Sequence, residues 1–293
     1  MPRKSRASGT STQQHQRVLP AALANAPATP LPKQFTLILR NNDYFAQADG
    51  GPEFYVGSRT KYQEYKGLYN LRGTANQRYD RTQYHTGPDA FWADFIAPTA
   101  AAEGGLFHTL NTYDRARFTF GFLQYAAHVP NGDFVRYLRA LLALPLAPAY
   151  FPDLAIVDGH VNVHTGTLYV PLETDASTEN LMTYLNPTAT NIEDVEVIQA
   201  AKFVHWVDND PAHAALQVKL GIQLFKTNLY ALAQRYALDG RPADQCLVVA
   251  DISHQGRAMA VQIRQALASQ NPLEALRVEL ATSAKPKPDA AKH

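Results

Sequence analysis

The sequence predicts an α+β fold that is mostly helical and contains one or two small β-hairpins. From about residue 190 onward, apolar side chains recur at helical spacing with few interruptions. Residues 116–122, ARFTFGF, instead alternate strictly between apolar and polar side chains, which is typical of a strand with one buried face. Hydrophobic residues make up 46% of the chain and charged residues 18%, a balance that allows a sizeable core.

The first part of the chain is expected to hold one strand, a polar segment and one helix. Residues 35–40, FTLILR, predict a strand from their apolar and β-branched content. Residues 41–87 are rich in tyrosine, arginine and lysine, and they fit either loops that cover a core or a surface that stacks on sugar rings. Residues 87–105 predict a helix that begins near Pro88, is kinked or divided at Pro98, and ends at two glycines.

A small hairpin is expected over residues 105–122, because the turn-forming residues NTYD precede the alternating strand and GLFHTL can supply its partner. Two helices, LQYAAH and DFVRYLRALLAL, are expected to follow. Residues 159–170 predict another strand or hairpin, whereas the strands within residues 146–190 cannot be placed. The rest of the chain to residue 283 is expected to form helices.

The composition changes at both ends of the chain. Residues 1–33 and 284–293 contain little that could pack, so we expect a disordered leader, one domain over residues 34–283 and a disordered tail. No apolar run approaches the ~20 residues that span a bilayer, and we recognise no Sec signal. The net charge of +1 argues against nucleic acid as the main partner. The single cysteine, Cys246, is expected to be a buried structural thiol.

Two carboxylates in residues 102–122 suggest a chemistry. Glycoside hydrolysis typically uses two carboxyl groups that flank the scissile bond, one protonated and one ionised. Glu103 suits the protonated acid, because it continues an apolar face and stands at the negatively polarised end of a helix. Asp114 suits the ionised partner, because it lies in a polar turn beside Arg115 and Arg117.

Further side chains near this turn are candidates for positioning water or sugar. Thr119 lies on the polar face of the strand after the turn, where it could hold a water with Asp114. Tyr113 and Arg117 would line a sugar subsite. Gln124 could point an amide into the same cleft, although an ordinary surface glutamine fits the sequence equally well.

The residues Glu103, Tyr113-Asp114 and Thr119-Phe120-Gly121 resemble the lysozyme-like glycosidases, most closely the phage-type muramidases. In that family a glutamate closes a helix, an aspartate lies in a small hairpin and a threonine follows. The resemblance implies a lysozyme-like domain with insertions that cleaves the β-1,4 bond between N-acetylmuramic acid and N-acetylglucosamine in peptidoglycan, without a metal or other cofactor. It implies Glu103 as the general acid, with Asp114 and Thr119 binding the attacking water.

Several alternatives stay open beside the muramidase. Related scaffolds carry chitosanase and lytic transglycosylase activity, and a non-catalytic module could bind cell-wall glycan or a secretion partner. A muramidase made in the cytoplasm without a Sec signal would reach the cell wall or periplasm after lysis, as phage enzymes do, or through a dedicated secretion apparatus. An antibacterial effector of the second kind would need an immunity protein in its producer.

Three other groups of polar residues have structural explanations that we favour. Residues 160–164, HVNVH, could place two histidines and an asparagine toward a metal, but polar side chains on the wet face of a hairpin are common. Asp210 is expected to cap a helix that begins at Pro211. Ser253 and His254 are adjacent and seldom face each other productively, so we expect a loop and a helix start at Gln255-Gly256.

Overall fold

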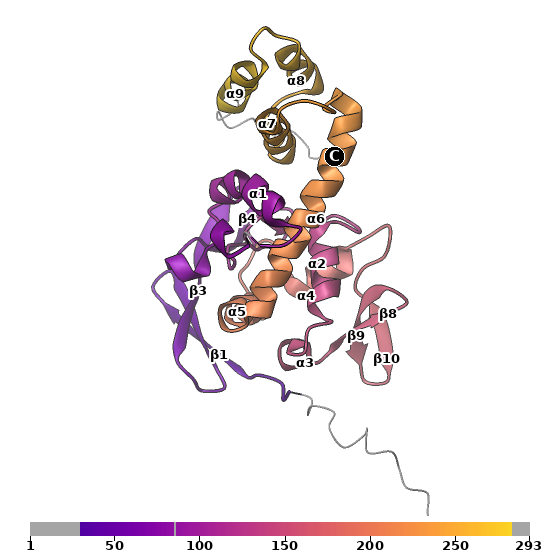
Figure 1. Ribbon diagram of the computed structural model, residues 1–293. Helices are drawn as coiled ribbons and strands as arrows, with labels where there is room; N and C mark the ends of the chain where they lie inside the picture. The colour runs from indigo at the N-terminus through magenta and orange to yellow at the C-terminus, as the bar shows by residue number, and fades with distance from the viewer. Residues whose placement is uncertain (1–29, 85, 283–293) are drawn as a thin grey trace, which may run out of the picture. The chain divides into compact units, whose positions relative to one another are not determined.

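The computed structural model describes residues 30–84 and 86–282 of the chain (Figure 1). The predicted α+β class is confirmed: the described residues form nine α-helices and two antiparallel sheets, and helices account for about 45% of the chain. The expected tail and most of the expected leader lie outside the described residues.

The larger sheet contains seven strands in sequential order, each antiparallel to its neighbours. Its strands are β1 (Phe35–Arg40), β2 (Asp43–Ala48), β3 (Glu53–Tyr62), β4 (Tyr65–Asn70), β5 (Leu110–Asn111), β6 (Thr119–Phe120) and β7 (Tyr125–Ala126). The strand over residues 35–40 and the hairpin within residues 105–122 are therefore confirmed. The interpretation of residues 41–87 as loops was wrong for β2, β3 and β4; in β2 the buried side chains of Tyr44, Ala46 and Ala48 share one face of the sheet and alternate with partly buried ones.

Residues 87–105 were expected to form a helix that is kinked at Pro98 or two short helices. Helix α1 (Ala90–Ala102) is one helix that contains Pro98, so the second alternative does not hold. Pro98 is exposed, so water can satisfy the carbonyl group that loses its helical partner there. The segment LQYAAH is strand β7 and not a helix, because Gln124 adopts φ 54° and its N–H bonds to Gly121 O at 3.0 Å in a tight turn.

The smaller sheet accounts for much of residues 146–190. Its strands β8 (Leu154–Val157), β9 (His160–Thr165) and β10 (Leu168–Pro171) form two hairpins in the order β10-β9-β8. The turns contain Gly159 and Gly166, both with positive φ. The hairpin predicted over residues 159–170 is confirmed.

The helices predicted over 133–144 and beyond residue 190 are confirmed in outline. The remaining α-helices are α2 (Asp133–Leu141), α3 (Ala147–Tyr150), α4 (Glu179–Leu185), α5 (Asp194–Asn209), α6 (Pro211–Tyr236), α7 (Ala243–His254), α8 (Ala260–Leu267) and α9 (Pro272–Thr282). Two 3-10 turns, η2 (Ala75–Gln77) and η3 (Arg81–Tyr84), follow β4.

Asp210 caps α6 as expected, since its Oδ1 accepts from Ala212 N at 3.0 Å. Helix α7 continues through Ser253 and His254, and the next helix starts at Ala260 rather than at Gln255.

Helix α5 packs against β1, β2 and β3, and α6 links this core to α7 (Figure 1). The main core includes Val56, Leu68, Phe203 and Trp206, which are almost completely buried. A second cluster joins the end of α6 to α7, α8 and α9, and contains Tyr236, Leu238, Val249, Ile252, Ile263, Ala266, Leu267 and Leu276. Cys246 packs against both clusters and is only partly buried, which corrects the expectation of a fully buried thiol.

Candidate functional site

The turn between β5 and β6 holds Asp114 in a defined orientation. Asp114 Oδ1 accepts a hydrogen bond from Ala116 N at 2.8 Å, and Oδ2 accepts one from Asn111 Nδ2 at 3.0 Å. The carbonyl oxygen of the Asn111 side chain accepts from Tyr113 N at 3.1 Å. Asn111 therefore orients the carboxylate as well as the backbone of the turn.

The strand register brings Thr119 to the same face of the sheet as Asn111. The two residues are directly paired across β5 and β6, and directly paired residues of antiparallel strands share a face. The same pairing continues across the sheet to form a row made up of Asp43, Ser58, Tyr69, Asn111 and Thr119. The Asp114 carboxylate, bound by Asn111, is thereby attached to a polar row that crosses the sheet.

The far end of this polar row is also a connected group. Arg72 Nη1 donates to Asp43 at 2.8 Å, and the Arg72 guanidinium lies 4.5 Å from the centre of the Tyr55 ring. Hydrogen bonds from Ser58 and then Arg72 lower the pKa of Asp43. This end of the sheet presents an aromatic ring beside a fixed ion pair.

Glu103 stands at the end of α1, where sequence reasoning expected it. It is the C-cap residue and is partly buried, and its N–H still bonds to Thr99 O at 3.1 Å. Gly104 and Gly105 follow with φ 90° and 66°, conformations that glycine adopts without strain. The glycines turn the chain away from the helix axis directly after the carboxyl group.

A cavity of about 500 Å³ opens beside this helix end. It lies between the segment after β4 and the last turns of α1, and its lining includes Arg78, Tyr79, Arg81, Ala100 and Gly104. Tyr79 N donates to Gly105 O at 2.8 Å, and Arg78 forms a β-bridge with Leu106. Glu103 lies next in sequence to Gly104, which lines this cavity, but Glu103 itself is not one of the lining residues.

The hairpin tip and the helix end are held by different parts of the fold. Asn186 Nδ2 donates to Thr112 O at 3.2 Å and to Arg117 O at 3.1 Å, which fastens the hairpin tip near α4 and α5. The hydrogen-bond partners of Asp114 described above all lie within the hairpin. The structure thus brings together Asp114 and Thr119 through Asn111, and those contacts do not include Glu103.

The candidate sugar-binding residues are engaged to different degrees. Arg117 forms an ion pair with Glu179 at 3.0 Å and donates to the Thr183 hydroxyl at 3.2 Å, so its guanidinium is bound at α4. Gln124 Nε2 donates to Gly121 O at 3.1 Å within its own turn. Burial, and then the charge of Asp114, raises the pKa of the Tyr113 hydroxyl. Thr119 is 6% exposed.

Sequence reasoning missed Gln217, which fastens the hairpin to α6. Its Oε1 accepts from Phe122 N at 3.2 Å, and its Nε2 donates to Phe107 O at 2.9 Å. Gly121 has φ 92°, and a Cβ there would lie 2.6 Å from the Gln217 oxygen. A single glutamine inside an amphipathic helix carries no local signal of this contact, whereas Asn111, close before Asp114 in the turn sequence, could have been suspected.

A buried carboxyl group on α5 was also missed. Glu196 accepts a hydrogen bond from the Thr112 hydroxyl, and within the described chain its Oε2 has no hydrogen-bond partner. Burial raises the pKa of Glu196 to about 8, so this side chain holds its proton at neutral pH. Glu196 lies under the hairpin tip and does not line the cavity at the end of α1.

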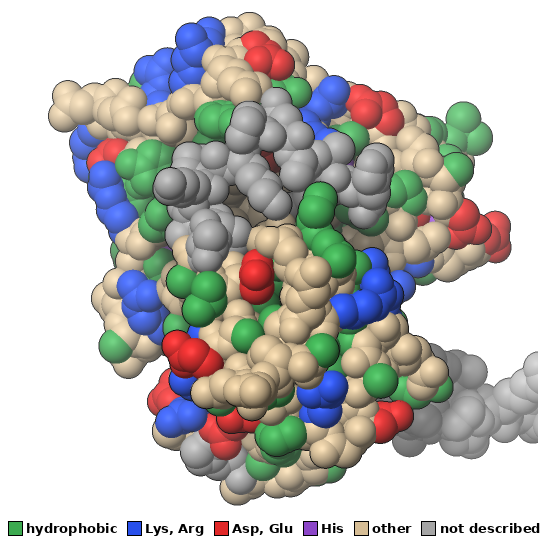
Figure 2. Space-filling view, turned by 90° about the horizontal axis from the view of Figure 1, so that it is seen from above, with side chains coloured by type: hydrophobic (Ala, Val, Ile, Leu, Met, Phe, Trp, Pro, Cys, Tyr) green, Lys and Arg blue, Asp and Glu red, His purple; other side chains and the backbone are tan. Residues whose placement is uncertain are grey.

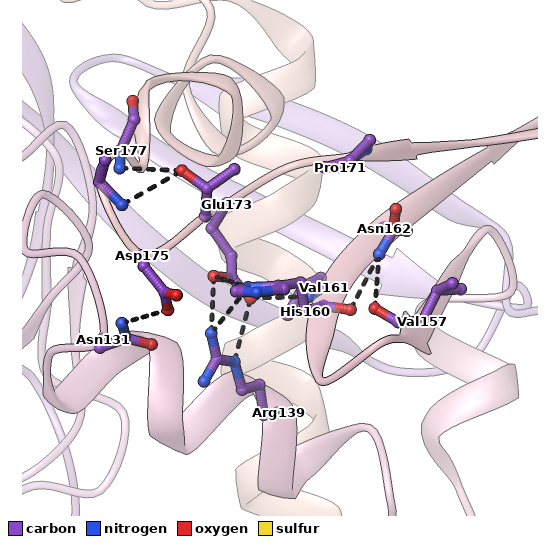
Figure 3. Close-up of polar contacts among 12 residues, drawn as sticks. Asn131, Arg139, Val157, His160, Val161, Asn162, Pro171, Glu173, Asp175 and Ser177 are labelled. Atoms are coloured by element: carbon purple, nitrogen blue, oxygen red, sulfur yellow. Dashed lines mark hydrogen bonds and ion pairs between the residues drawn. The ribbon is translucent and has the colours of Figure 1, made fainter.

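The first histidine of HVNVH, His160, is part of a structural cluster (Figure 3). Buried Glu173 binds Arg139 Nη2 at 2.7 Å, His160 Nδ1 at 3.0 Å and Val161 N at 2.7 Å, which links α2 to the smaller sheet. Burial acts to raise the pKa of Glu173, but the bonds from Arg139 and His160 outweigh it and the pKa is lowered. His164 lies against the Tyr169 ring. Among the described residues, no group of three or more His, Cys, Asp or Glu is placed to hold a metal.

Comparisons with protein-family models, curated proteins and solved structures found no match. None of the helices in the described ranges is long and apolar enough to cross a membrane. On the face seen in Figure 2, basic and acidic side chains are interspersed with hydrophobic ones. A function for this chain therefore has to be argued from the residues and geometry of the site.

Proposed function

We propose that the protein is a muramidase that hydrolyses the β-1,4 bond between N-acetylmuramic acid and N-acetylglucosamine in peptidoglycan. The observation that carries this proposal is the position of Glu103 as the C-cap of α1, next in sequence to Gly104, which lines a cavity of about 500 Å³. A partly buried carboxyl group at the negative end of a helix dipole favours its protonated form. Such a group can protonate the oxygen of a leaving sugar.

The cavity has a lining that suits a glycan. Tyr79 lines it, and the Tyr79 ring is fixed by its hydroxyl, which donates to Ala93 O at 2.7 Å, and by stacking on Tyr84, so a sugar would meet the exposed edge of this aromatic pair. Arg78 and Arg81 outnumber the one acidic residue of the lining, Asp80, although Arg81 also pairs with Asp94 at 3.4 Å. Muramic acid carries a lactyl carboxylate when it is not amidated, so these cations favour a peptidoglycan strand over a cationic polymer such as chitosan.

The second carboxylate would act through water in this proposal. Asp114 is fixed by Asn111, and Thr119 is the cross-strand neighbour of Asn111. In an inverting hydrolase the base and the acid are separated by roughly 6.5–9.5 Å, which leaves room for the attacking water. We assign Asp114 to that base and Thr119 to holding the water, with Tyr113, Arg117 and Gln124 as sugar contacts.

A non-catalytic glycan-binding module is the second candidate. Both carboxylate oxygens of Asp114 are already hydrogen-bonded, and Thr119 is only 6% exposed. Those two observations fit a hairpin that has a structural role and binds no water for catalysis. The substrate lies in the bacterial wall, and we propose that the protein reaches it after lysis or through a dedicated secretion apparatus. An exported hydrolase would also need an immunity protein in its producer.

The deciding experiment compares wild type with Glu103→Gln on purified peptidoglycan sacculi, with mass spectrometry of the released fragments. Glu64→Gln is the matched control, since Glu64 is exposed in the turn between β3 and β4. Reducing disaccharide muropeptides from wild type and the control, but not from Glu103→Gln, would support a muramidase. Anhydro products would indicate a lytic transglycosylase. Binding to sacculi without release by any of the three proteins would refute the hydrolase and leave the binding module.

A further inference from the structure

A second cavity, of about 410 Å³, lies between α2 and α6, two helices that pack against each other (Figure 1). Its lining is made up of Tyr125 from β7, Asp133 and Arg136 from α2, and Leu220, Gln223, Leu224, Lys226 and Thr227 from α6. None of these residues lines the cavity at the end of α1. Small-molecule sites typically have volumes of about 300–1,000 Å³, so this cavity is large enough for a ligand of its own.

Part of the lining is apolar. Leu220 and Leu224 are four residues apart on α6, so they share one face of the helix. Tyr125 is buried, and its hydroxyl donates to Gln217 O at 2.8 Å, so its polar atom already has a partner. An apolar group of a ligand would therefore be removed from water against two leucines and an aromatic side chain.

Asp133 and Arg136 bring opposite charges to the same cavity without pairing. They are three residues apart on α2, a spacing that leaves ~5–6 Å between Cβ atoms on one helix face. Within residues 30–84 and 86–282, neither side chain forms a hydrogen bond or an ion pair. Burial raises the pKa of Asp133, and the charge of Arg136 opposes that shift. Both charged groups are thus open to a ligand.

The third charged residue of the lining already has partners. Lys226 Nζ binds Asp89 Oδ1 at 2.6 Å and lies 5.4 Å from the centre of the Trp92 ring. The hydroxyl of Thr227 is also engaged, because it donates to Gln223 O at 2.9 Å. The cavity therefore offers one open carboxyl group and one open guanidinium. Electrostatic complementarity favours a ligand that carries both charges over one that is only an anion or only a cation.

We propose that the cavity between α2 and α6 binds a free α-amino acid with an apolar side chain. The ammonium group donates to Asp133, the carboxylate accepts from Arg136, and the side chain packs against Leu220 and Leu224. Charge-assisted bonds of this kind are strong, and a guanidinium can bind a carboxylate through two parallel bonds. An α-amino acid carries both charges on one carbon atom, which suits two partners that are neighbours on one helix face. The proposal does not rest on the muramidase function.

Ligand-observed NMR titration of the full-length protein tests the site with L-leucine, L-phenylalanine and two analogues of leucine. N-acetyl-L-leucine keeps the carboxylate and lacks the ammonium group, whereas L-leucinamide keeps the ammonium group and lacks the carboxylate. We expect L-leucine to bind, and each analogue to bind about tenfold more weakly. If neither amino acid binds at millimolar concentration, or if both analogues bind as well as L-leucine, the proposal is overturned.

Two variants assign the charged groups of the ligand to their partners. Asp133→Asn should weaken L-leucine about tenfold and no longer distinguish it from N-acetyl-L-leucine, whereas Arg136→Gln should no longer distinguish it from L-leucinamide. Asp244→Asn, which changes an exposed aspartate in the first turn of α7, and Lys219→Gln, which changes an exposed lysine on α6, are the matched controls.

Circular dichroism establishes that each variant is folded. Equal losses of L-leucine binding in the variants and their controls would overturn the proposal. Tighter binding of N-acetylglucosamine than of either amino acid, lost in the variants at Asp133 and Arg136, would also overturn it and indicate a sugar site. Hydrolysis of sacculi enters neither measurement, so failure of the muramidase proposal leaves this result unchanged.

Discussion

The side-chain amide of Asn111 donates a hydrogen bond to the carboxylate of Asp114 at 3.0 Å, while its oxygen accepts from Tyr113 N. One amide therefore fixes the carboxylate and the turn that carries it. Because Asn111 is also the cross-strand partner of Thr119, it is the connection between the two residues that we assign to the attacking water.

Replacing Asn111 by alanine should impair hydrolysis more than binding. The variant frees one oxygen of Asp114 and leaves the turn without its side-chain acceptor, so the carboxylate loses its fixed orientation. We expect kcat on sacculi to fall by about 10- to 100-fold, with little change in KM. Asn228→Ala, which changes an exposed asparagine on α6, is the control. Equal activity of the two variants would exclude a role for Asn111 in positioning Asp114.

Glu103→Gln should abolish general acid catalysis while the fold is retained. An amide cannot transfer the proton, and losing a general acid typically costs about 10²–10⁴-fold in rate. Glu103 is a cap residue at the helix C-terminus and binds Thr99 O through its backbone, which the substitution leaves intact. Thermal unfolding of the variant and of wild type is measured alongside activity. A large fall in melting temperature alongside the loss of activity would point to a structural role.

The pair formed by Gly121 and Gln217 should be sensitive to a single methyl group. Gly121→Ala introduces a side chain at φ 92° and places its Cβ 2.6 Å from Gln217 Oε1. Gly240→Ala is a matched control, because Gly240 has φ 78° but nothing within 4 Å of its added Cβ. Backbone strain should lower the free energy of unfolding of both variants by about 1 kcal/mol. The contact with Gln217 should lower that of Gly121→Ala by roughly 2 kcal/mol more. Equal destabilisation in urea would show that the Gln217 contact contributes nothing.

Glu196 should make the protein less stable as the pH rises. Burial raises its pKa from 4.5 to about 8, so between these values the folded state holds a proton that the unfolded state has lost. The free energy of unfolding therefore falls as pH rises through this window. Glu196→Gln removes that dependence, so from pH 5 to pH 9 the free energy of unfolding of wild type should fall relative to that of the variant by on the order of 4 kcal/mol. Denaturant unfolding at both pH values tests this, with exposed Glu274→Gln as the control.

His213 should make the protein less stable as the pH falls below neutral. It is completely buried against Tyr137, and burial lowers the pKa of His213 from 6.5 to about 3. Between these values the unfolded state binds a proton that the folded state excludes, so stability is lost as pH falls below 6.5. The double variant Tyr137→Phe/His213→Phe replaces both polar partners with rings of similar shape. Its free energy of unfolding should vary less between pH 7 and pH 4 than that of wild type.

Local patterns in the chain were enough to predict the elements around the site. The alternation of Phe118, Phe120 and Phe122 predicted the strand after the turn, and two glycines marked the end of α1 directly after Glu103. Asp210 and Pro211 predicted a helix start that the structure has. These features depend on backbone conformation within a few residues, which side-chain type and spacing control directly.

The contacts that complete the site could be decided only by tertiary structure. Asp251 reaches Thr99 across a sequence separation of 152 residues, and Gln217 reaches Phe122 across 95. Neither side chain differs in type from an ordinary polar residue on an amphipathic helix, so its role depends on which face the packing of α6 and α7 turns inward. The same holds for Glu196. The residues around it in the sequence fit an exposed glutamate on a helix, and only the packing of α5 under the hairpin removes it from water.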